Sequence, residues 1–238
     1  MRHILVQGAA ELGLALSDAQ VEQFERYFAF LVEKNRVMNL TAIMEKDAAA
    51  RLHFLDCLAL LNLGGFEGAR VMDIGSGAGF PGVPLKIVQE DIALTLLDAQ
   101  KKRVSFLEEL CQELGLEDVD CIHSRAEESA LQPLMRDGFD IVVSRAVARL
   151  NVLNELCLPF VKVGGRFIAM KGPDSDEEIQ EALHSAKVLR AEMESVFDYT
   201  IPGTDVRHRA VVYRKKGETP KGYPRRFAKI QKSPLKTK

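Results

Sequence analysis

The sequence has 238 residues, of which 47% are hydrophobic and 28% are charged, and its formal net charge is −2. This composition is typical of a folded domain with a buried core, and it argues against disordered and collagen-like chains. No run approaches the roughly 18 apolar residues of a membrane span and no signal peptide is recognisable, so we expect a cytoplasmic protein.

The first part of the chain is predicted to be helical. Ser17 followed by Gln20 is a capping-box pair, and apolar residues recur at helical spacing over 17–35. Leucines at similar spacing predict a second helix over 47–61. Because no strand pattern appears in this region, we expect residues 1–65 to form an N-terminal helical cap.

From residue 66 to residue 216, segments typical of strands and of helices alternate. Strands are predicted over 69–75, 92–99, 119–124, 139–146, 164–172, 195–202 and 208–215. Helices are predicted over 81–89, 101–114, 150–161 and 175–193. The alternation predicts an α/β domain with a Rossmann-like, seven-stranded, mostly parallel sheet that is covered by helices on both faces.

The remaining residues, 217–238, form a basic C-terminal tail with three prolines and no periodicity, which predicts an extended or disordered segment. Residues 207–238 hold twelve Lys and Arg against one acid and carry +11. Residues 1–206 hold twenty Lys and Arg against thirty-three acids and carry −13. This asymmetry favours a polyanionic partner such as nucleic acid, although such charges can also serve solubility alone.

The segment DIGSGAGFPGVP (73–84) joins the first predicted strand to the first helix of the alternating region, where an α/β sheet holds its ligand. It contains two overlapping glycine patterns. One, G-x-G-x-x-G, is typical of a dinucleotide site and consists of Gly77, Gly79 and Gly82. The other, D-x-G-x-G-x-G, consists of Asp73, Gly75, Gly77 and Gly79.

Asp73 favours the second pattern, because a carboxylate at the end of the strand would repel a pyrophosphate. It suits a cationic ligand, such as the sulfonium of S-adenosylmethionine (SAM). Prolines 81 and 84 also place the start of the helix too late for a dinucleotide turn, which leaves an NAD(P) oxidoreductase as the weaker alternative. Asp98 ends the second predicted strand, where an acid can accept both ribose hydroxyls.

Beyond the glycine loop, nearly the whole sequence resembles the RsmG family, the small-subunit ribosomal RNA (guanine-N7) methyltransferases. The resemblance rests on NLTAI (39–43), HFLDCL (53–58), VMDIGSGAGFPGVPLKI (71–87), DAQKKRVSFL (98–107), SRAEE (124–128), FDIVVSRAVARL (139–150), GGRFIAMKG (164–172), RHRAVVYRK (207–215) and YPRRFAKIQKSPL (223–235). It implies the fold of a class I SAM-dependent methyltransferase and methyl transfer to N7 of a guanine in 16S ribosomal RNA.

The resemblance also implies which residues bind. Its SAM contacts fall on Gly75, Phe80, Ala126, Glu127 and Arg145, with Asp73 and Asp98 at the methionine and ribose ends and with Gly77 and Gly79 in the loop. Contacts to RNA are expected from Lys171, Arg207, Arg225 and Arg226, and positioning of the guanine from Arg145, Lys171 and Arg207.

The chemistry that this family implies needs few side chains. N7 of guanine carries a free lone pair, so no base has to remove a proton, and catalysis can consist mostly of positioning. We interpret His53 as a packed helix residue. The four cysteines lack a C-x-x-C pair, so no metal site is expected. We expect a monomer that acts on ribosomal RNA or the small subunit. A small-molecule or protein methyltransferase and a SAM-binding, non-catalytic ribosome-assembly or regulatory factor remain alternatives.

Overall fold

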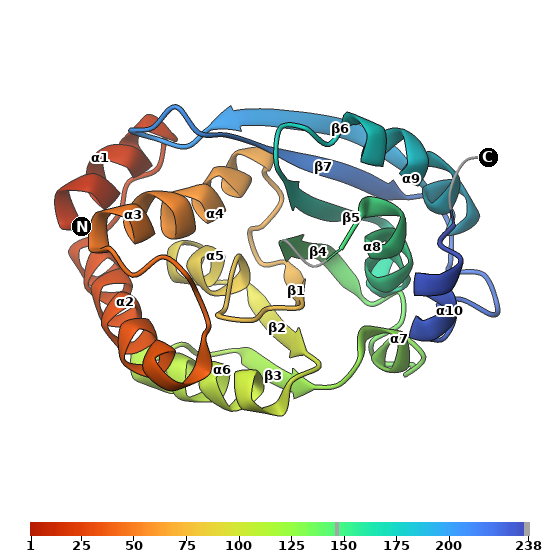
Figure 1. Cartoon of the computed structure of the whole chain (residues 1–238), viewed down its shortest axis with the longest axis horizontal. Helices are drawn as coiled ribbons and strands as arrows, with labels where there is room; N and C mark the ends of the chain where they lie inside the picture. Colours follow the sequence, from red (N-terminus) through yellow and green to blue (C-terminus); the bar gives the residue numbers. More distant parts are fainter. Residues whose placement is uncertain (146–147, 236–238) are drawn as a thin grey trace.

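The computed structural model describes residues 1–145 and 148–235, which form one sheet with helices on both sides (Figure 1). The strands are β1 (Arg70–Ile74), β2 (Ala93–Asp98), β3 (Val119–His123), β4 (Phe139–Arg145), β5 (Val161–Lys171), β6 (Ala191–Thr200) and β7 (Arg207–Lys215). Their order in the sheet is β3-β2-β1-β4-β5-β7-β6, and β7 alone runs antiparallel to its neighbours. The predicted seven-stranded, mostly parallel sheet is therefore confirmed. Residue 146, the last of the expected fourth strand, lies outside the described residues.

Two layers of helices cover the two faces of this sheet. Among the described residues the α-helices are α1 (Arg2–Glu11), α2 (Asp18–Met38), α3 (Lys46–Ala49), α4 (Asp56–Leu58), α5 (Gly82–Val88), α6 (Lys101–Leu114), α7 (Ala126–Ser129), α8 (Leu150–Cys157), α9 (Asp176–Val188) and α10 (Phe227–Lys232). A π-helical turn, η1 (Ala50–Leu55), joins α3 to α4, and short 3₁₀ turns follow as η2 (Ala59–Leu63) and η3 (Leu158–Phe160). No helix in these two ranges is both long and apolar enough to cross a bilayer.

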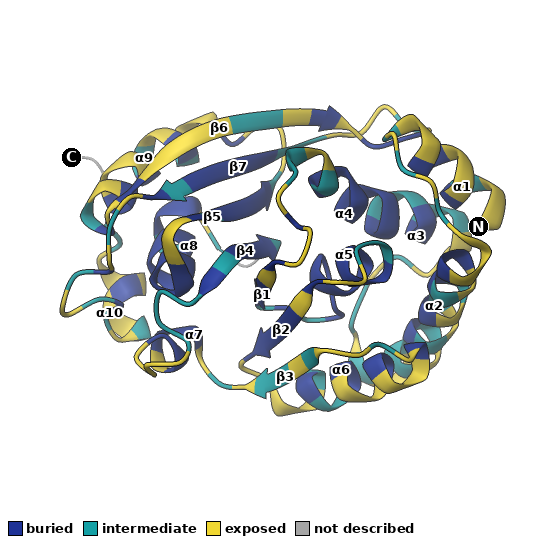
Figure 2. Cartoon of the chain, turned by 180° about the vertical axis from the view of Figure 1, so that it is seen from behind, coloured by how far each residue is buried: buried dark blue, intermediate teal, exposed yellow. Residues whose placement is uncertain are grey.

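The alternation of side chains along the central strands divides the core into two clusters. In β1, Val71 packs into the cluster beneath α1, α2, α5 and α6, whereas Met72 and Ile74 pack into the cluster beneath α8 and α9. This is the twofold periodicity of a strand that is buried on both faces. Figure 2 shows the central strands buried and the outer surfaces of the covering helices exposed.

The N-terminal helices share the first of these core clusters. The capping box of Ser17 and Gln20 is present and starts α2 one residue later than predicted. The helix expected over 47–61 is interrupted by the π-helical turn η1 (Ala50–Leu55). The sequence carries no local signal that indicates this turn. Helix α1 (Arg2–Glu11), whose hydrophobic pattern is weak, has no separate sequence prediction.

The described part of the C-terminal tail is packed rather than extended, unlike the sequence-based expectation. Thr219 and Lys215 both hydrogen-bond Asp137, and Ile230 of α10 is fully buried in the second core cluster. The Lys215 ammonium is itself buried and donates to the carbonyls of Leu158 and Val161. Specific polar anchors therefore order a segment that has no hydrophobic period. Residues 236–238 lie outside the described part.

Candidate functional site

The glycine loop leaves β1 at the point where the sheet order reverses, with β2 on one side of β1 and β4 on the other. Gly75, Gly77 and Gly79 all have positive φ angles of 74°, 56° and 96°. A β-carbon on Gly79 would lie 2.5 Å from the hydroxyl of Tyr27, so glycine is required there. That hydroxyl donates to the carbonyl of Ala78 at 2.5 Å and thereby attaches the loop to helix α2.

A cavity of about 430 Å³ opens over this loop. Its lining residues come from the loop, from the turn after β2, from the end of β4 and from the helical cap: Leu40, Thr41, His53, Gly75, Ser76, Gly77, Ala78, Phe80, Asp98, Ala99, Gln100, Arg103 and Arg145. We call it the cofactor cavity. Among the expected SAM contacts, Gly75, Gly77, Phe80, Asp98 and Arg145 meet here, whereas Gly79 packs beneath the loop against Tyr27.

Asp98 holds the loop and faces the cofactor cavity. It is almost fully buried, and its carboxylate accepts the backbone N–H groups of Gly77 at 3.0 Å and Gln100 at 2.8 Å. The guanidinium of Arg103 lies 3.6 Å away. A carboxylate held in this way is oriented by the backbone and can accept a pair of hydroxyl groups.

Asp73 lies beneath the glycine loop and does not line the cofactor cavity. Its Oδ2 accepts the N–H of Gly82 at 2.8 Å, and a β-carbon on Gly82 would come within 2.9 Å of that oxygen. Burial raises the pKa of Asp73 to about 7, because the interior disfavours the charged form. Asp73 therefore lies outside the lining of the cofactor cavity and holds the first turn of α5 through Gly82, and its expected contact with the methionine end stays a prediction.

Ala126 and Glu127 open helix α7, three residues after β3 ends, and neither lines the cofactor cavity. Glu127 instead pairs with Arg125 at 3.7 Å and borders a cavity of about 460 Å³ beside the tail helix α10. The structure thus places these two expected SAM contacts next to the site and not in its lining.

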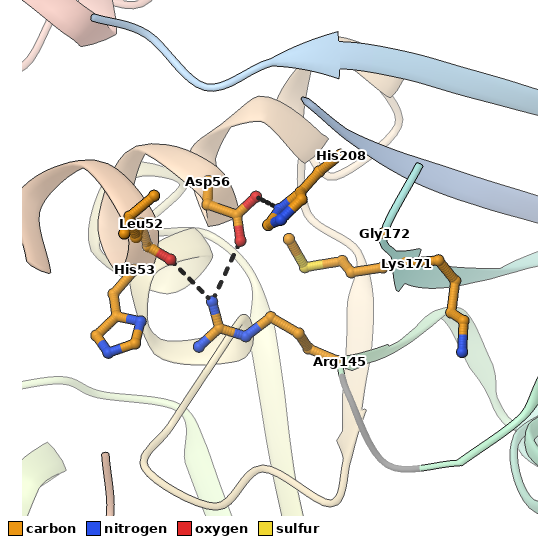
Figure 3. Close-up of a pocket in the computed structure, with 8 residues that line it drawn as sticks. Leu52, His53, Asp56, Arg145, Lys171, Gly172 and His208 are labelled. Carbon is orange, nitrogen blue, oxygen red and sulfur yellow. Dashed lines mark hydrogen bonds and ion pairs between the residues drawn. The ribbon is translucent and has the colours of Figure 1, made fainter. Parts of the chain in front are cut away.

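A second cavity, of about 470 Å³, adjoins the first (Figure 3). It is lined by Leu52, His53, Asp56, Arg145, Met170, Lys171, Gly172 and His208. We call it the acceptor cavity. His53 and Arg145 line both cavities, so the two spaces meet at these side chains.

Asp56 organises the floor of the acceptor cavity. Only 1% of its side chain is exposed, and it accepts from Tyr199 Oη at 2.9 Å, His208 Nδ1 at 2.8 Å and Arg145 Nη1 at 3.3 Å. Because a carboxylate only accepts, the proton of His208 must sit on Nδ1. This hydrogen bond raises the pKa of His208 above its ordinary value, against the opposing effect of burial.

His53 lies between the two cavities, in the π-helical turn. Its ring stacks on Phe80 at 4.6 Å between centroids, and its Nε2 is 2.8 Å from Thr41 Oγ1. Burial, with the nearby Arg145 cation, lowers its pKa to about 4, so the ring is neutral near pH 7. The guanidinium of Arg145 covers the same Phe80 ring at 4.6 Å. His53 is packed, as interpreted from the sequence, but it also lines the site.

Of the residues expected to contact RNA or position the guanine, Arg145 and Lys171 line the acceptor cavity. Nζ of Lys171 pairs with Glu178 at 2.7 Å and donates to the carbonyl of Ala148 at 3.1 Å. Arg207 faces a separate cavity of about 340 Å³, because side chains alternate along β7 and His208 takes the position toward Asp56. Arg207 therefore lies outside the lining of the acceptor cavity, and its expected role in positioning the guanine stays a prediction.

The two tail arginines differ in their surroundings. Arg225 binds the buried carboxylate of Glu155 through its backbone N–H at 2.9 Å, Nε at 2.8 Å and Nη2 at 2.6 Å. Arg225 thus anchors the tail to the core, and the RNA contact that the resemblance implies for it stays a prediction. Arg226 is exposed at the start of α10 and remains available to a partner. Within residues 1–145 and 148–235, no group of three or more His, Cys, Asp and Glu side chains could hold a metal ion.

The sequence prediction omitted Asp56 and His208, which lie 152 positions apart and meet only through the fold. Asp56 belongs to the motif HFLDCL and His208 to the motif RHRAVVYRK, which both carry the family resemblance. This membership is the sequence feature that could have marked the two residues as functional. Motif membership does not say which residues of two distant motifs touch.

Comparisons with known proteins identify the family and the fold. A family model described as rRNA small subunit methyltransferase G matches residues 20–207. Two proteins named ribosomal RNA small subunit methyltransferase G, from Thermoanaerobacter and Caldanaerobacter subterraneus, are 45% and 46% identical over 98% of this chain and 97% of their own length. A solved SAM-dependent methyltransferase from Aquifex aeolicus superposes with a TM-score of 0.51 at 22% identity, over 71% of this chain and 94% of that one. The structural likeness concerns the fold.

Proposed function

The chain belongs to the rRNA small subunit methyltransferase G family, and we propose that it transfers the methyl group of SAM to N7 of a guanine in the RNA of the small ribosomal subunit. The observation that carries this proposal is the pair of cavities that meet at His53 and Arg145. One cavity has the glycine loop of a nucleotide cofactor. The other has cationic side chains and opens at the carboxyl end of the sheet.

The residues of the first cavity fit SAM. Asp98 offers a backbone-oriented carboxylate for the ribose hydroxyls, and the loop glycines allow close approach. The rings of Phe80 and His53, which stack on each other, add apolar surface to the lining. Its volume lies within the range of small-molecule sites. When bound, SAM supplies an electrophilic methyl group on a sulfonium ion. The protein then has to hold this group facing the second cavity.

The second cavity suits a purine that has been turned out of its RNA stack. N7 attacks with its own lone pair, so the residues need only bind and orient the base. Lys171, Arg145 and His208 place positive charge or donors around the cavity, which favours the electron-rich edge of guanine, with N7 and O6, over an apolar acceptor. Methyl transfer here requires no general base, in keeping with a site built from a stacked histidine and ion-paired cations.

We also propose an oligomeric state and a location. The enzyme is expected to act as a monomer in the cytoplasm, on ribosomal RNA or on the small subunit. The monomeric state is supported by the exposed large apolar side chains of the described residues, which come from several elements, as Val37 of α2, Val163 of β5 and Leu183 of α9 illustrate.

The main alternative is a ribosome-assembly or regulatory factor that binds SAM without using it. The adjoining second cavity favours the enzyme, since a pure SAM sensor needs no acceptor space. Transfer of tritiated methyl groups from SAM to unmodified small subunits, naked ribosomal RNA and total protein tests the choice, with chain cleavage at 7-methylguanine to map the product. Label in RNA at one guanine supports the proposal. Label only in protein, or in nothing, refutes it.

A further inference from the structure

The acceptor cavity contains a hydrogen-bonded pair, His208 and Asp56, to which the proposed function gives no specific role. Asp56 of α4 fixes Nδ1 of the imidazole, at 2.8 Å, and the ring lies edge-on to Tyr199 of β6. About 31% of the His208 side chain stays exposed, and the residue lines the cavity. Among the described residues Nε2 has no hydrogen-bond partner, so this nitrogen is the end of the ring that a ligand can meet.

The other polar groups of the cavity are engaged or less accessible. Arg145 uses Nη1 on Asp56 and on the carbonyl of Leu52, and Lys171 is paired with Glu178. Nε2 of His53 is held by Thr41, and its Nδ1 is buried without a partner. His208 differs because Asp56 fixes its ring while its side chain is more exposed than that of Arg145 or Lys171.

The geometry points to His208 as the residue that recognises the target base: its protonated Nε2–H donates to O6 of guanine and leaves N7 free for methylation. Asp56 is the positioning residue that holds the ring. This inference rests on the proposed function, because O6 enters the cavity only if guanine is the acceptor.

Such a donor also selects between purines. Guanine presents two acceptors on this edge, N7 and O6, whereas adenine presents the N6 amino donor next to N7. With adenine, the Nε2–H donor of a protonated His208 would face the N6 amino group, which is also a donor. Neither group would then have an acceptor, which is unfavourable when both are removed from water. One imidazolium therefore distinguishes the correct base without touching the atom that reacts.

Recognition by a protonated His208 makes the reaction sensitive to pH. The groups that face His208 are Asp56, Tyr199, Arg145, His53 and Lys171; Asp56 favours its proton, and Arg145 opposes it. Because Asp56 raises the pKa of His208, the donor form persists above the ordinary pKa of about 6.5 and is lost as the pH rises further. N7 itself needs no deprotonation, but Asp73, with a pKa of about 7, titrates in the same window. A fall in rate is therefore assigned to the imidazole only where His208→Gln abolishes it.

The test is methyl transfer to unmodified small subunits at saturating SAM, from pH 6 to 8.5, with kcat and KM for the subunit measured separately. His208→Leu should lower kcat roughly 10- to 100-fold, the usual effect of losing a hydrogen bond from a charged donor, while SAM affinity stays within about twofold. His208→Gln places an uncharged N–H near the same point, so it should keep more activity and lose the pH dependence. Asp56→Asn should move the pH midpoint downward. His184→Gln, on the exposed surface of α9, is the matched control.

The outcomes separate the two proposals. If the wild-type chain transfers no methyl group, the proposed function fails and this inference with it. If the wild type is active and His208→Leu matches its rate and pH profile, only the inference is overturned. A His208→Leu variant that loses SAM binding in step with activity also overturns it. If that variant does not fold, the His208→Gln profile decides, since an unchanged pH step excludes His208.

Discussion

Replacing Arg225 by alanine should destabilise the whole domain. Arg225 lies in the basic tail, yet its guanidinium forms two hydrogen bonds with Glu155 of α8, whose side chain has no exposed surface. Removing the guanidinium leaves a carboxylate in the core without its cation. The backbone N–H of residue 225 would still reach Glu155 at 2.9 Å, so part of its hydrogen bonding survives.

Breaking one partner of a buried ion pair costs about 3–5 kcal/mol, and the surviving backbone hydrogen bond places Arg225→Ala near the lower end of that range. For a domain of this size, each kcal/mol lowers the melting temperature by roughly 2–4 °C. We therefore expect a decrease of about 10 °C. The double variant Arg225→Ala with Glu155→Gln should recover part of the loss, because it removes the buried charge.

Differential scanning calorimetry on the variants measures the effect, and Arg226→Ala is the matched control. Arg226 is the next residue but is exposed, so its substitution should change stability by less than about 0.5 kcal/mol. It should instead weaken binding to ribosomal RNA and reduce the salt dependence of that binding. A melting temperature for Arg225→Ala within about 2 °C of wild type, together with weaker RNA binding, would show that Arg225 serves RNA and that the burial argument is wrong.

Four more outcomes follow from the described contacts. Asp98→Ala should weaken SAM binding at least tenfold in calorimetry without loss of helical circular dichroism; unchanged affinity would remove Asp98 from the site. Since the folded pKa of Asp73 is about 7, well above its ordinary value, the folded protein holds this proton more tightly than the unfolded chain does, and stability declines as the pH rises from about 4 to 7. Urea titrations at pH 5 and 8 give the loss of unfolding free energy between these two values, and this loss should be a few kcal/mol smaller in Asp73→Asn than in the wild type. An equal loss in both proteins would contradict the raised pKa. Tyr27→Phe should cost about 1 kcal/mol of unfolding free energy through the lost bond to Ala78, measured in the same titrations. Deleting residues 217–238 should reduce SAM binding and RNA methylation together, because the tail covers Glu155; a selective loss of methylation would restore the view of an independent RNA-binding tail.

The order of strands and helices could be predicted because each element carries its own periodicity. Helix α6 shows an apolar face and ends at Gly115 in the left-handed region, and both signals are local. Short elements without such signals, α7 and α10 among them, were not predicted. Helix α10 owes its order to Ile230 and Arg225, which pack against helix α8 from a distant part of the chain.

In the glycine loop, the sequence predicts the position of the helix but not the direction of a side chain. The helix predicted over 81–89 is present as α5, and Gly82 lies in its first turn. The sequence could not reveal that Asp73 turns under the loop to accept the N–H of Gly82, since the direction of one side chain depends on the packing around it. Arg207 and His208 differ from this case, because the alternation of side chains along β7 is enough to turn these neighbours toward different cavities.

The charges at the junction of the two cavities suit the proposed transfer. Moving a methyl group from a sulfonium to N7 carries one positive charge from the cofactor cavity into the acceptor cavity, and the sum over both does not change. Arg145 lies between the cavities, and the buried carboxylate of Asp56 offsets its charge at 3.3 Å. The neutral His53 ring, with a pKa of about 4, adds no charge at the crossing point. A site that does not have to create or neutralise charge during the reaction needs little reorganisation, so the rate depends on how firmly the base is held. That dependence makes the His208–Asp56 pair, rather than a general base, the place where substitutions should affect kcat most.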